Sequence, residues 1–259
     1  MVSFTFGENW QRYFKDSLDE GRVNIAKEQL LRFLELPTLS GRTFLDVGCG
    51  SGIHSLAALQ AGAVEVVSFD LDPGCVAAAN SLRDGREAEK WRILEGSILD
   101  RDFIGKLGQF DLVYAWGVLH HTGRMWEAVR LAISLVRPGG LFCVALYTTS
   151  RYSGFWLRVK QRYNSTSRLG KWLMEWTYMI VHLTVHCLWH LKSPWQRMRE
   201  HRELRGMDYR TDVRDWLGGY PFETARVEEV LNFCRREGKS ELININTQGA
   251  CTEYLFCRR

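Results

Sequence analysis

The sequence predicts an α/β fold in which a mostly parallel sheet is covered by helices on both faces. From about Gly41 to Leu146, short apolar runs alternate with segments of helical periodicity that end at Gly or Pro-Gly. Strand, helix and strand repeated in this way are typical of parallel sheets. At the C-terminus, residues 241–247 and 253–259 are two further β-rich runs joined by a short Gln-Gly-Ala link. They predict a terminal antiparallel hairpin.

The individual elements follow from composition and spacing. Short runs rich in Val, Leu, Ile and aromatic residues predict buried strands at residues 42–48, 64–70, 91–97, 110–117 and 139–147. Helical spacing predicts helices at residues 51–62, 72–85 and 125–140, and one or two more over 9–36 that end at Pro37. After the sheet core we expect a helical insertion over 151–205, a turn-rich loop over 206–223 and a short amphipathic helix over 225–238.

This order predicts four parts of the chain. They are an N-terminal helical cap (1–40), a ligand-binding core (41–150), a basic, aromatic helical insertion (151–210) and a C-terminal part that completes the core (211–259). At 259 residues, with 46% hydrophobic and 25% charged residues, the chain is expected to be soluble and globular, as one large domain or one domain with an appendage.

Composition also gives expectations about compartment and partners. The seven cysteines form no C-x-x-C pair, and the N-terminus lacks a basic segment followed by an apolar run. Both features favour a reducing, cytoplasmic location. The net charge is +4, but residues 151–210 carry twelve Lys or Arg against four acids, a local charge of +8. An anionic partner is therefore expected near this segment.

The stretch FLDVGCGSG, residues 44–52, predicts the ligand site. Glycines stand at every second position, whereas a dinucleotide fingerprint needs its third glycine one residue later, and no Gly-Lys-Ser/Thr ending indicates a P-loop. Asp46 would repel a phosphate and attract an ammonium or sulfonium group. Asp70, 22 residues after Gly48, ends the second predicted strand, where a carboxylate can accept both hydroxyls of a ribose. The alternative is that the glycines only make a tight turn and Asp70 only caps the next helix.

Five motifs in order, FLDVGCGSG, FDLDP, LEGSILD, FDLVYAWGVLHHT and LVRPGGLF, resemble those of a class I S-adenosylmethionine-dependent methyltransferase over about residues 40–147. The resemblance implies a Rossmann-like sheet of seven strands with an antiparallel last strand, S-adenosyl-L-methionine as cofactor and S-adenosyl-L-homocysteine as product. It places the methionine part beside the glycines and Asp46, the ribose on Asp70 and the adenine beside Leu71. The residues expected at the cofactor are Asp46, Gly48, Gly50, Gly52, Asp70, Leu71, Ser97, Ile98, Trp116 and, from the N-terminal helix, Trp10.

Methyl transfer to a hydroxyl needs a base but no metal ion, and histidine is the obvious group near neutral pH. His120 and His121 follow the fourth predicted strand, and the resemblance favours His121. Tyr147 is expected to orient the acceptor. The alternative for each histidine is a cap on the next helix, packed against Trp126.

The stretch DWLGGYPFE, residues 215–223, has the composition of a lid over the acceptor. Its candidate acceptor-binding residues are Trp216, Tyr220 and Glu223. The alternative is that Tyr220 and Phe222 only anchor this loop to the core.

Residues 176–191 of the insertion contain no charge unless a histidine is protonated, and sixteen residues fall short of the about 20 needed to span a bilayer. A helix packed on the core or on a second subunit is favoured over one at a membrane surface. His182, His186 and His190 share one helical face, and a polar stripe is favoured over a metal site. The interleaved Arg and aromatic residues also suit RNA, but no RNA-binding module accompanies them.

The wider sequence, including FGENW, WGVLHHTG and DWLGGYPFE, resembles a bacterial group of small-molecule methyltransferases. We expect methyl transfer to an oxygen, or secondarily a nitrogen, of a small molecule, including a sugar-containing or lipid-linked one. An RNA methyltransferase and a non-catalytic cofactor-binding protein are the alternatives, and nucleic acid ranks below a small molecule as partner. A peripheral lipid contact through residues 151–200 and a homodimer are left open.

Overall fold

The fold was analysed in a computed structural model, which describes residues 20–83, 89–190, 193, 196, 209–249 and 251–259. Its centre is a seven-stranded sheet in the order β3-β2-β1-β4-β5-β7-β6. All strands run parallel except β7, which is antiparallel to both neighbours, so the predicted fold class and terminal hairpin are confirmed. The strands are β1 (Thr43–Val47), β2 (Glu65–Asp70), β3 (Trp91–Glu95), β4 (Phe110–Trp116), β5 (Val136–Tyr147), β6 (Ser240–Asn246) and β7 (Cys251–Arg258).

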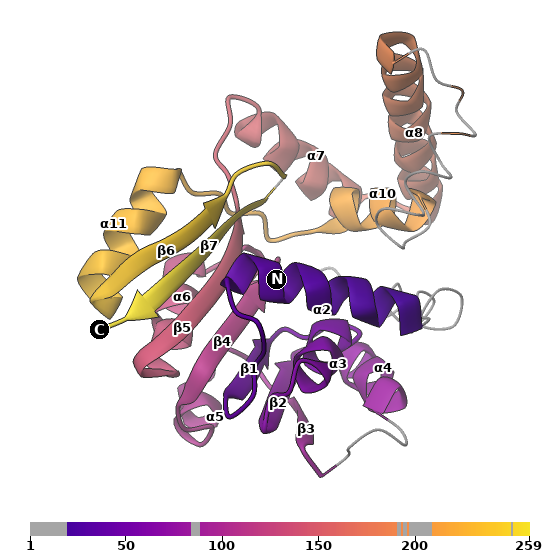
Figure 1. The fold of residues 1–259 in the computed structure, drawn as a ribbon. Coiled ribbons are helices and arrows are strands. Elements are labelled where there is room, and N and C mark those ends of the chain that lie inside the picture. The colour runs from indigo at the N-terminus through magenta and orange to yellow at the C-terminus, as the bar shows by residue number, and fades with distance from the viewer. Residues whose placement is uncertain (1–19, 84–88, 191–192, 194–195, 197–208, 250) are drawn as a thin grey trace.

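Helices lie on both faces of this sheet (Figure 1), and alternating side chains of the strands are buried beneath them. Leu45 and Val47 of β1 point to one face, whereas Phe44 points to the other. The first face is covered by α5 (Arg101–Gly105), α6 (Met125–Ser134) and α11 (Val227–Gly238). The second is covered by α2 (Glu20–Leu34), α3 (Ile53–Gln60) and α4 (Pro73–Arg83). The expected helix over 125–140 is too long, because residues 136–140 belong to β5.

The insertion after β5 forms a separate helical group that extends away from the sheet (Figure 1). It contains α7 (Ser153–Ser165), α8 (Arg168–His190) and α10 (Tyr209–Gly218). These helices share a small apolar cluster of their own, formed by Tyr163, Met179, Tyr209, Val213 and Leu217. None of the described helices has the length and apolar character needed to cross a membrane.

One element differs from the sequence expectation. Residues 206–223 were expected to form a turn-rich loop, yet Tyr209–Gly218 is helical. Tyr209, Val213 and Leu217 repeat every four residues and are buried against α7 and α8, so tertiary packing outweighs the polar composition of the segment. The irregular part begins only after Gly218. The expected helix over 9–36 is described from residue 20 onward, as α2.

Candidate functional site

A cavity of about 1060 Å³ opens at the carboxyl ends of β1, β2, β4 and β5. We call its two parts the glycine half and the insertion half. Asp46, Gly48, Gly50, Asp70, Leu71, Ser97 and Ile98 line the glycine half, and His120, His121, Tyr147, Tyr178, His182, Tyr209, Trp216 and Tyr220 line the insertion half. Ligand pockets are typically about 300–1000 Å³, so this cavity has room for a cofactor and an acceptor together.

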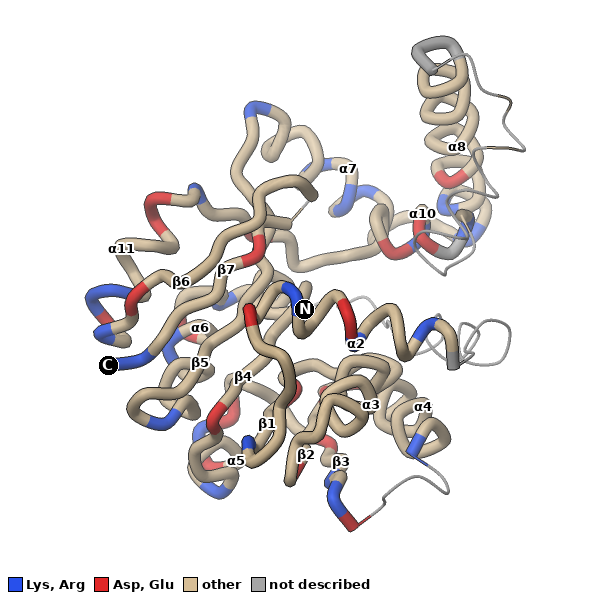
Figure 2. Tube along the Cα trace, viewed as in Figure 1, with Lys and Arg blue, Asp and Glu red and all other residues tan. Residues whose placement is uncertain are grey.

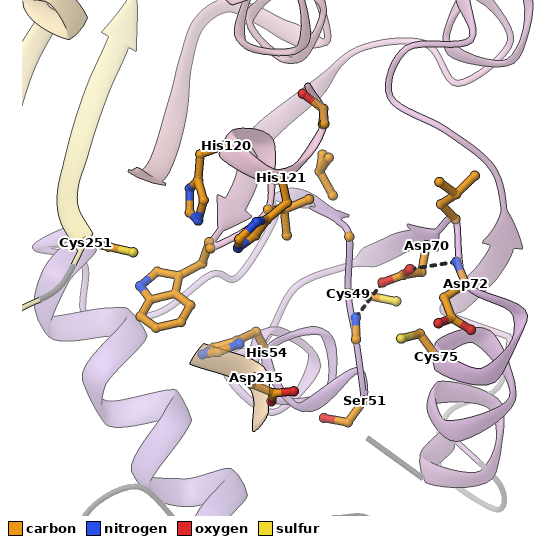
Figure 3. A pocket seen from close by; sticks show the side chains of 18 of the residues that line it. Cys49, Ser51, His54, Asp70, Asp72, Cys75, His120, His121, Asp215 and Cys251 are labelled. Carbon is orange, nitrogen blue, oxygen red and sulfur yellow. Dashed lines mark hydrogen bonds between the residues drawn. The ribbon is translucent and has the colours of Figure 1, made fainter. Parts of the chain in front are cut away.

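Asp70 fixes the glycine loop against the second strand (Figure 3). Its Oδ2 accepts the backbone N–H of Gly50 at 3.0 Å, and its Oδ1 accepts that of Asp72 at 2.9 Å. Burial raises the pKa of this carboxyl, and the backbone N–H groups oppose the rise. Each oxygen has lone-pair capacity for a further donor. Asp70 therefore stabilises the glycine loop, and its side chain also lines the cavity.

The glycine backbone is required by geometry at two positions. Gly48 has φ +69°, and a Cβ there would lie 2.5 Å from Val118 Cγ1. Gly52 has φ +80°, and a Cβ there would lie 2.9 Å from the Trp91 ring. Gly48 lines the cavity, but Gly52 does not. The third glycine thus serves the turn into α3 and its packing on β3.

Asp46 lies at the floor of the glycine half and is only 3% exposed. Its Oδ2 accepts the hydroxyl of Ser55 at 2.6 Å. Burial raises the pKa of its carboxyl to about 7, with a smaller contribution from the nearby Asp70. The hydroxyl of Ser51, also buried at the cavity wall, has no hydrogen-bond partner within the described residues. These groups suit a ligand with a cationic amino group.

The remaining expected cofactor residues frame the glycine half. Leu71 is 67% exposed and offers an apolar surface after β2, and Ile98 is buried opposite the loop. Ser97 accepts the N–H of Leu99 at 3.2 Å. Trp116 lines the cavity at the end of β4 and donates its indole N–H to Glu253 at 2.6 Å. Trp10 lies outside the described residues.

His121 has a defined tautomer. Its Nδ1 lies 2.7 Å from the carbonyl oxygen of Pro221, which can only accept, so Nδ1 carries the proton and Nε2 the basic lone pair. Burial lowers the pKa of this imidazole to about 4, and the hydrogen bond to Pro221 opposes that effect. His121 is therefore neutral at pH 7 and lines the insertion half.

His120 differs from its neighbour. It is fully buried, and neither ring nitrogen makes a hydrogen bond of ordinary geometry within the described part of the chain. Burial, followed by the electrostatic interaction with the neighbouring His121 ring, lowers the pKa of His120 well below its usual value. Its ring lies 4.0 Å from the Tyr147 ring, centroid to centroid. Trp126 packs on Phe233, and Glu223 accepts the first N–H of α6, so the described contacts do not support helix capping by either histidine.

Aromatic rings enclose Tyr147 at the end of β5. Trp216 lies 5.8 Å and Phe222 5.2 Å from its ring. Lys160 of α7 is buried behind them, donates to the carbonyl oxygen of Trp216 and lies 4.3 Å from the Trp216 ring. Burial lowers the pKa of this ammonium to about 7. This part of the wall of the insertion half is thus aromatic, with an amine behind it.

Two of the three expected acceptor residues line the cavity, Trp216 and Tyr220. The third, Glu223, does not. Its carboxylate accepts the N–H of Met125 at 3.0 Å and so caps α6.

Sequence reasoning missed several cavity residues. His54 of α3 lies 5.0 Å from the Tyr114 ring, and burial lowers its pKa to about 4. Its position in the first turn after the glycine loop could have revealed it. Tyr178 and His182 of α8 stack at 5.6 Å, and His182 Nδ1 lies 2.6 Å from the hydroxyl of Tyr209. No local pattern indicates that these helices reach the cavity.

Comparisons with known proteins show what the chain is similar to. A family model described as a methyltransferase domain matches residues 18–201. The chain is 33% identical over 102 residues to a tRNA U34 carboxymethyltransferase of Methylococcus capsulatus, covering 39% of this chain and 31% of that protein. It is 37% identical over 112 residues to a ribosomal protein L11 methyltransferase of Azotobacter vinelandii, covering 42% and 35%. The chain thus spans about a third of the length of these curated relatives.

Among solved structures, the magnesium protoporphyrin IX methyltransferase of Synechocystis PCC 6803 with bound SAH superposes with a TM-score of 0.58. The superposition covers 97% of this chain and 94% of that one, at 13% identity, and it establishes a shared fold. The family model spans well over half of the chain. The protein therefore belongs to the methyltransferase-domain family, and the expectation of a class I methyltransferase is confirmed for family and fold.

Proposed function

We propose that the protein is an S-adenosylmethionine-dependent methyltransferase that methylates an oxygen of a small molecule, with sugar-containing and lipid-linked acceptors included. One observation carries the proposal. A neutral histidine of fixed tautomer, His121, lines the same cavity as a glycine loop bordered by Asp46 and Asp70. The glycine half, which would hold the cofactor, and the insertion half, which holds the proton acceptor, thus belong to one cavity.

The side chains of the glycine half match the chemical groups of the cofactor. Asp70 offers two oxygens to the ribose hydroxyls, and Leu71 and Ile98 offer apolar surface to the adenine. Asp46 offers a buried carboxylate to the amino group of the methionine part, which favours the charged form of that carboxyl. The cofactor supplies a methyl group on a positively charged sulfur.

The residues of the insertion half handle the acceptor and its proton. With Nδ1 held by Pro221, the lone pair of His121 Nε2 can take the proton of an acceptor hydroxyl as its oxygen attacks the methyl. A base with a pKa of about 4 suits an acidic hydroxyl, or a proton that leaves late as the new bond forms. Tyr147, Trp216 and Tyr220 would orient the acceptor and exclude water.

The experiment uses cofactor with a trideuterated methyl group and a metabolite extract. We expect small-molecule features that gain the labelled methyl with the native protein and not with heat-inactivated protein, read by mass spectrometry. Fragmentation then identifies oxygen or nitrogen as the acceptor atom. Labelled nucleosides from extract RNA, with no labelled metabolite, would contradict the proposal in favour of an RNA methyltransferase. Cofactor binding without any labelled product would favour a non-catalytic role.

RNA is the second candidate acceptor, because two cations of the insertion already make contacts within the protein. The +8 charge of residues 151–210 would attract phosphates. However, Lys160 is buried behind the cavity wall and Arg210 pairs with Glu175 at 3.3 Å. The cavity itself is lined by aromatic side chains at the insertion, which favours a small acceptor.

A further inference from the structure

Helix α8 has two unlike faces. Its inner face carries Glu175 and Met179, which are buried against α7 and α10. Its outer face, formed by Leu169, Trp172, Leu173, Trp176, Ile180, Val181 and Val185, is exposed, with Ile180 at 60% and Val185 at 59%. Thr177 and Thr184 are the other exposed positions between Leu169 and Val185, so this outer face contains no charge.

We infer that the outer face of α8 docks on an anionic lipid surface. An exposed apolar face of this length on a helix that carries two tryptophans is typical of helices that lie in a membrane interface. Figure 1 shows α8 extending away from the sheet, and Figure 2 shows no charged position on the tan turns of α8 between its red position and its grey end. Within the described part of the chain, the helix can thus meet a flat surface before the sheet does.

The cations around the outer face identify the surface as anionic. Arg168 is exposed at the first turn of α8, and Lys171 follows it three residues later. They belong to a segment with a net charge of +8. Basic residues beside an apolar helical face bind anionic headgroups while the apolar side chains enter the interface.

The same charge argues against a second copy of this chain on the outer face. Among the described residues of 151–210, seven Lys or Arg stand against one acid, so two copies packed through this helix would bring like charges together, and like charges repel. The helix lies on the surface rather than across it, because Glu175 on its inner face is held by Arg210 and Arg214. The inference does not depend on the proposed methyl transfer.

Docking would also orient the cavity. Tyr178 and His182, at the edge of α8 next to its outer face, line the insertion half. A lipid surface on one side of the helix would therefore lie one helix diameter, about 10 Å, from the acceptor.

The test is flotation of the full chain with vesicles of equal parts phosphatidylglycerol and phosphatidylcholine, compared with phosphatidylcholine alone. We expect the native protein to bind the anionic vesicles at least about tenfold more strongly. The double variant Ile180→Glu, Val185→Glu should lose about tenfold or more of this binding. The matched control is Ile25→Glu, Val64→Glu, because Ile25 and Val64 are 50% and 51% exposed on the body of the protein. This control should bind like the native protein.

Three results would overturn the inference. The first is a native protein that does not bind anionic vesicles, as expected if another part of the chain covers the outer face. The second is equal binding by the two double variants. The third is a lipid-free dimer, seen by sedimentation velocity, that Ile180→Glu, Val185→Glu converts to a monomer. Binding of S-adenosylhomocysteine by both double variants, measured by calorimetry, shows that they are folded.

Discussion

The two halves of the cavity are built in different ways. In the glycine half, each functional side chain lies at the end of a strand or in the turn that follows it, and backbone hydrogen bonds such as Gly50 to Asp70 hold it there. In the insertion half, α8 and α10 bring Tyr178, Tyr209 and Trp216 from outside the sheet. The sheet thus fixes what the cofactor meets, whereas the insertion decides what else can enter. Changes in the two halves should therefore affect different measurements.

The largest effect is expected for His121→Asn. The asparagine amide keeps a donor near the Nδ1 position and its bond to Pro221, but it removes the basic Nε2. Transfer of labelled methyl to the extract acceptor should fall by about 10²–10⁴-fold. Affinity for S-adenosylhomocysteine, measured by calorimetry, should change by less than about twofold. An unchanged transfer rate would remove His121 from the mechanism.

The complementary change is Asp70→Asn in the glycine half. It removes the charge that receives two ribose hydroxyls, so affinity for S-adenosylhomocysteine should fall by about 10–100-fold. Calorimetry measures this directly. The control is Asp102→Asn, an exposed residue in the first turn of α5 that does not line the cavity. If both variants bind S-adenosylhomocysteine with the same affinity, the assignment of the cofactor to the glycine half is wrong.

A third test concerns the proton of Asp46. Burial raises the pKa of this carboxyl to about 7 in the free protein, so below pH 7 it is protonated. The ligand's ammonium favours the ionised form, and binding must then release a proton. The affinity for S-adenosylhomocysteine, measured by calorimetry across this pH range, should therefore weaken about tenfold per pH unit as the pH falls below 7. Above pH 7 it should become constant. The change Asp46→Asn should weaken binding and flatten this profile, and a flat profile in the native protein would contradict the assignment.

The smallest effect is expected for Glu175→Gln in the insertion. Glu175 accepts the hydroxyl of Tyr163 at 2.9 Å. It also pairs with Arg214 at 3.0 Å and with Arg210 at 3.3 Å, and both arginine side chains are partly solvated. The variant should lose about 1 kcal/mol of local stability, and this loss should be confined to α7, α8 and α10. Hydrogen exchange of these helices should accelerate about fivefold, which is that free energy converted at 25 °C, while β1 and β4 stay protected. Glu127→Gln, which breaks an ion pair on α6, is the control.

The same contrast explains what sequence reasoning could predict. The sheet, the glycine loop and Asp70 were predictable because strand periodicity and a fixed motif order specify them locally. The helix α10 was not, because its residues are helical only through packing on α7 and α8. Glu223 was assigned to the acceptor by composition, yet it caps α6 over a separation of 98 residues. Tyr178 and Tyr209 reach the cavity through tertiary packing, which no local pattern encodes.

The most direct measurement is the electron density of crystals soaked with S-adenosylhomocysteine. The account predicts adenine between Leu71 and Ile98, the ribose hydroxyls on Asp70 and the amino group near Asp46. It also predicts that the sulfur faces His121 across the cavity. Density elsewhere on the protein, or an empty glycine half at saturating ligand, would contradict the central claim that this loop and its two acids form the cofactor site.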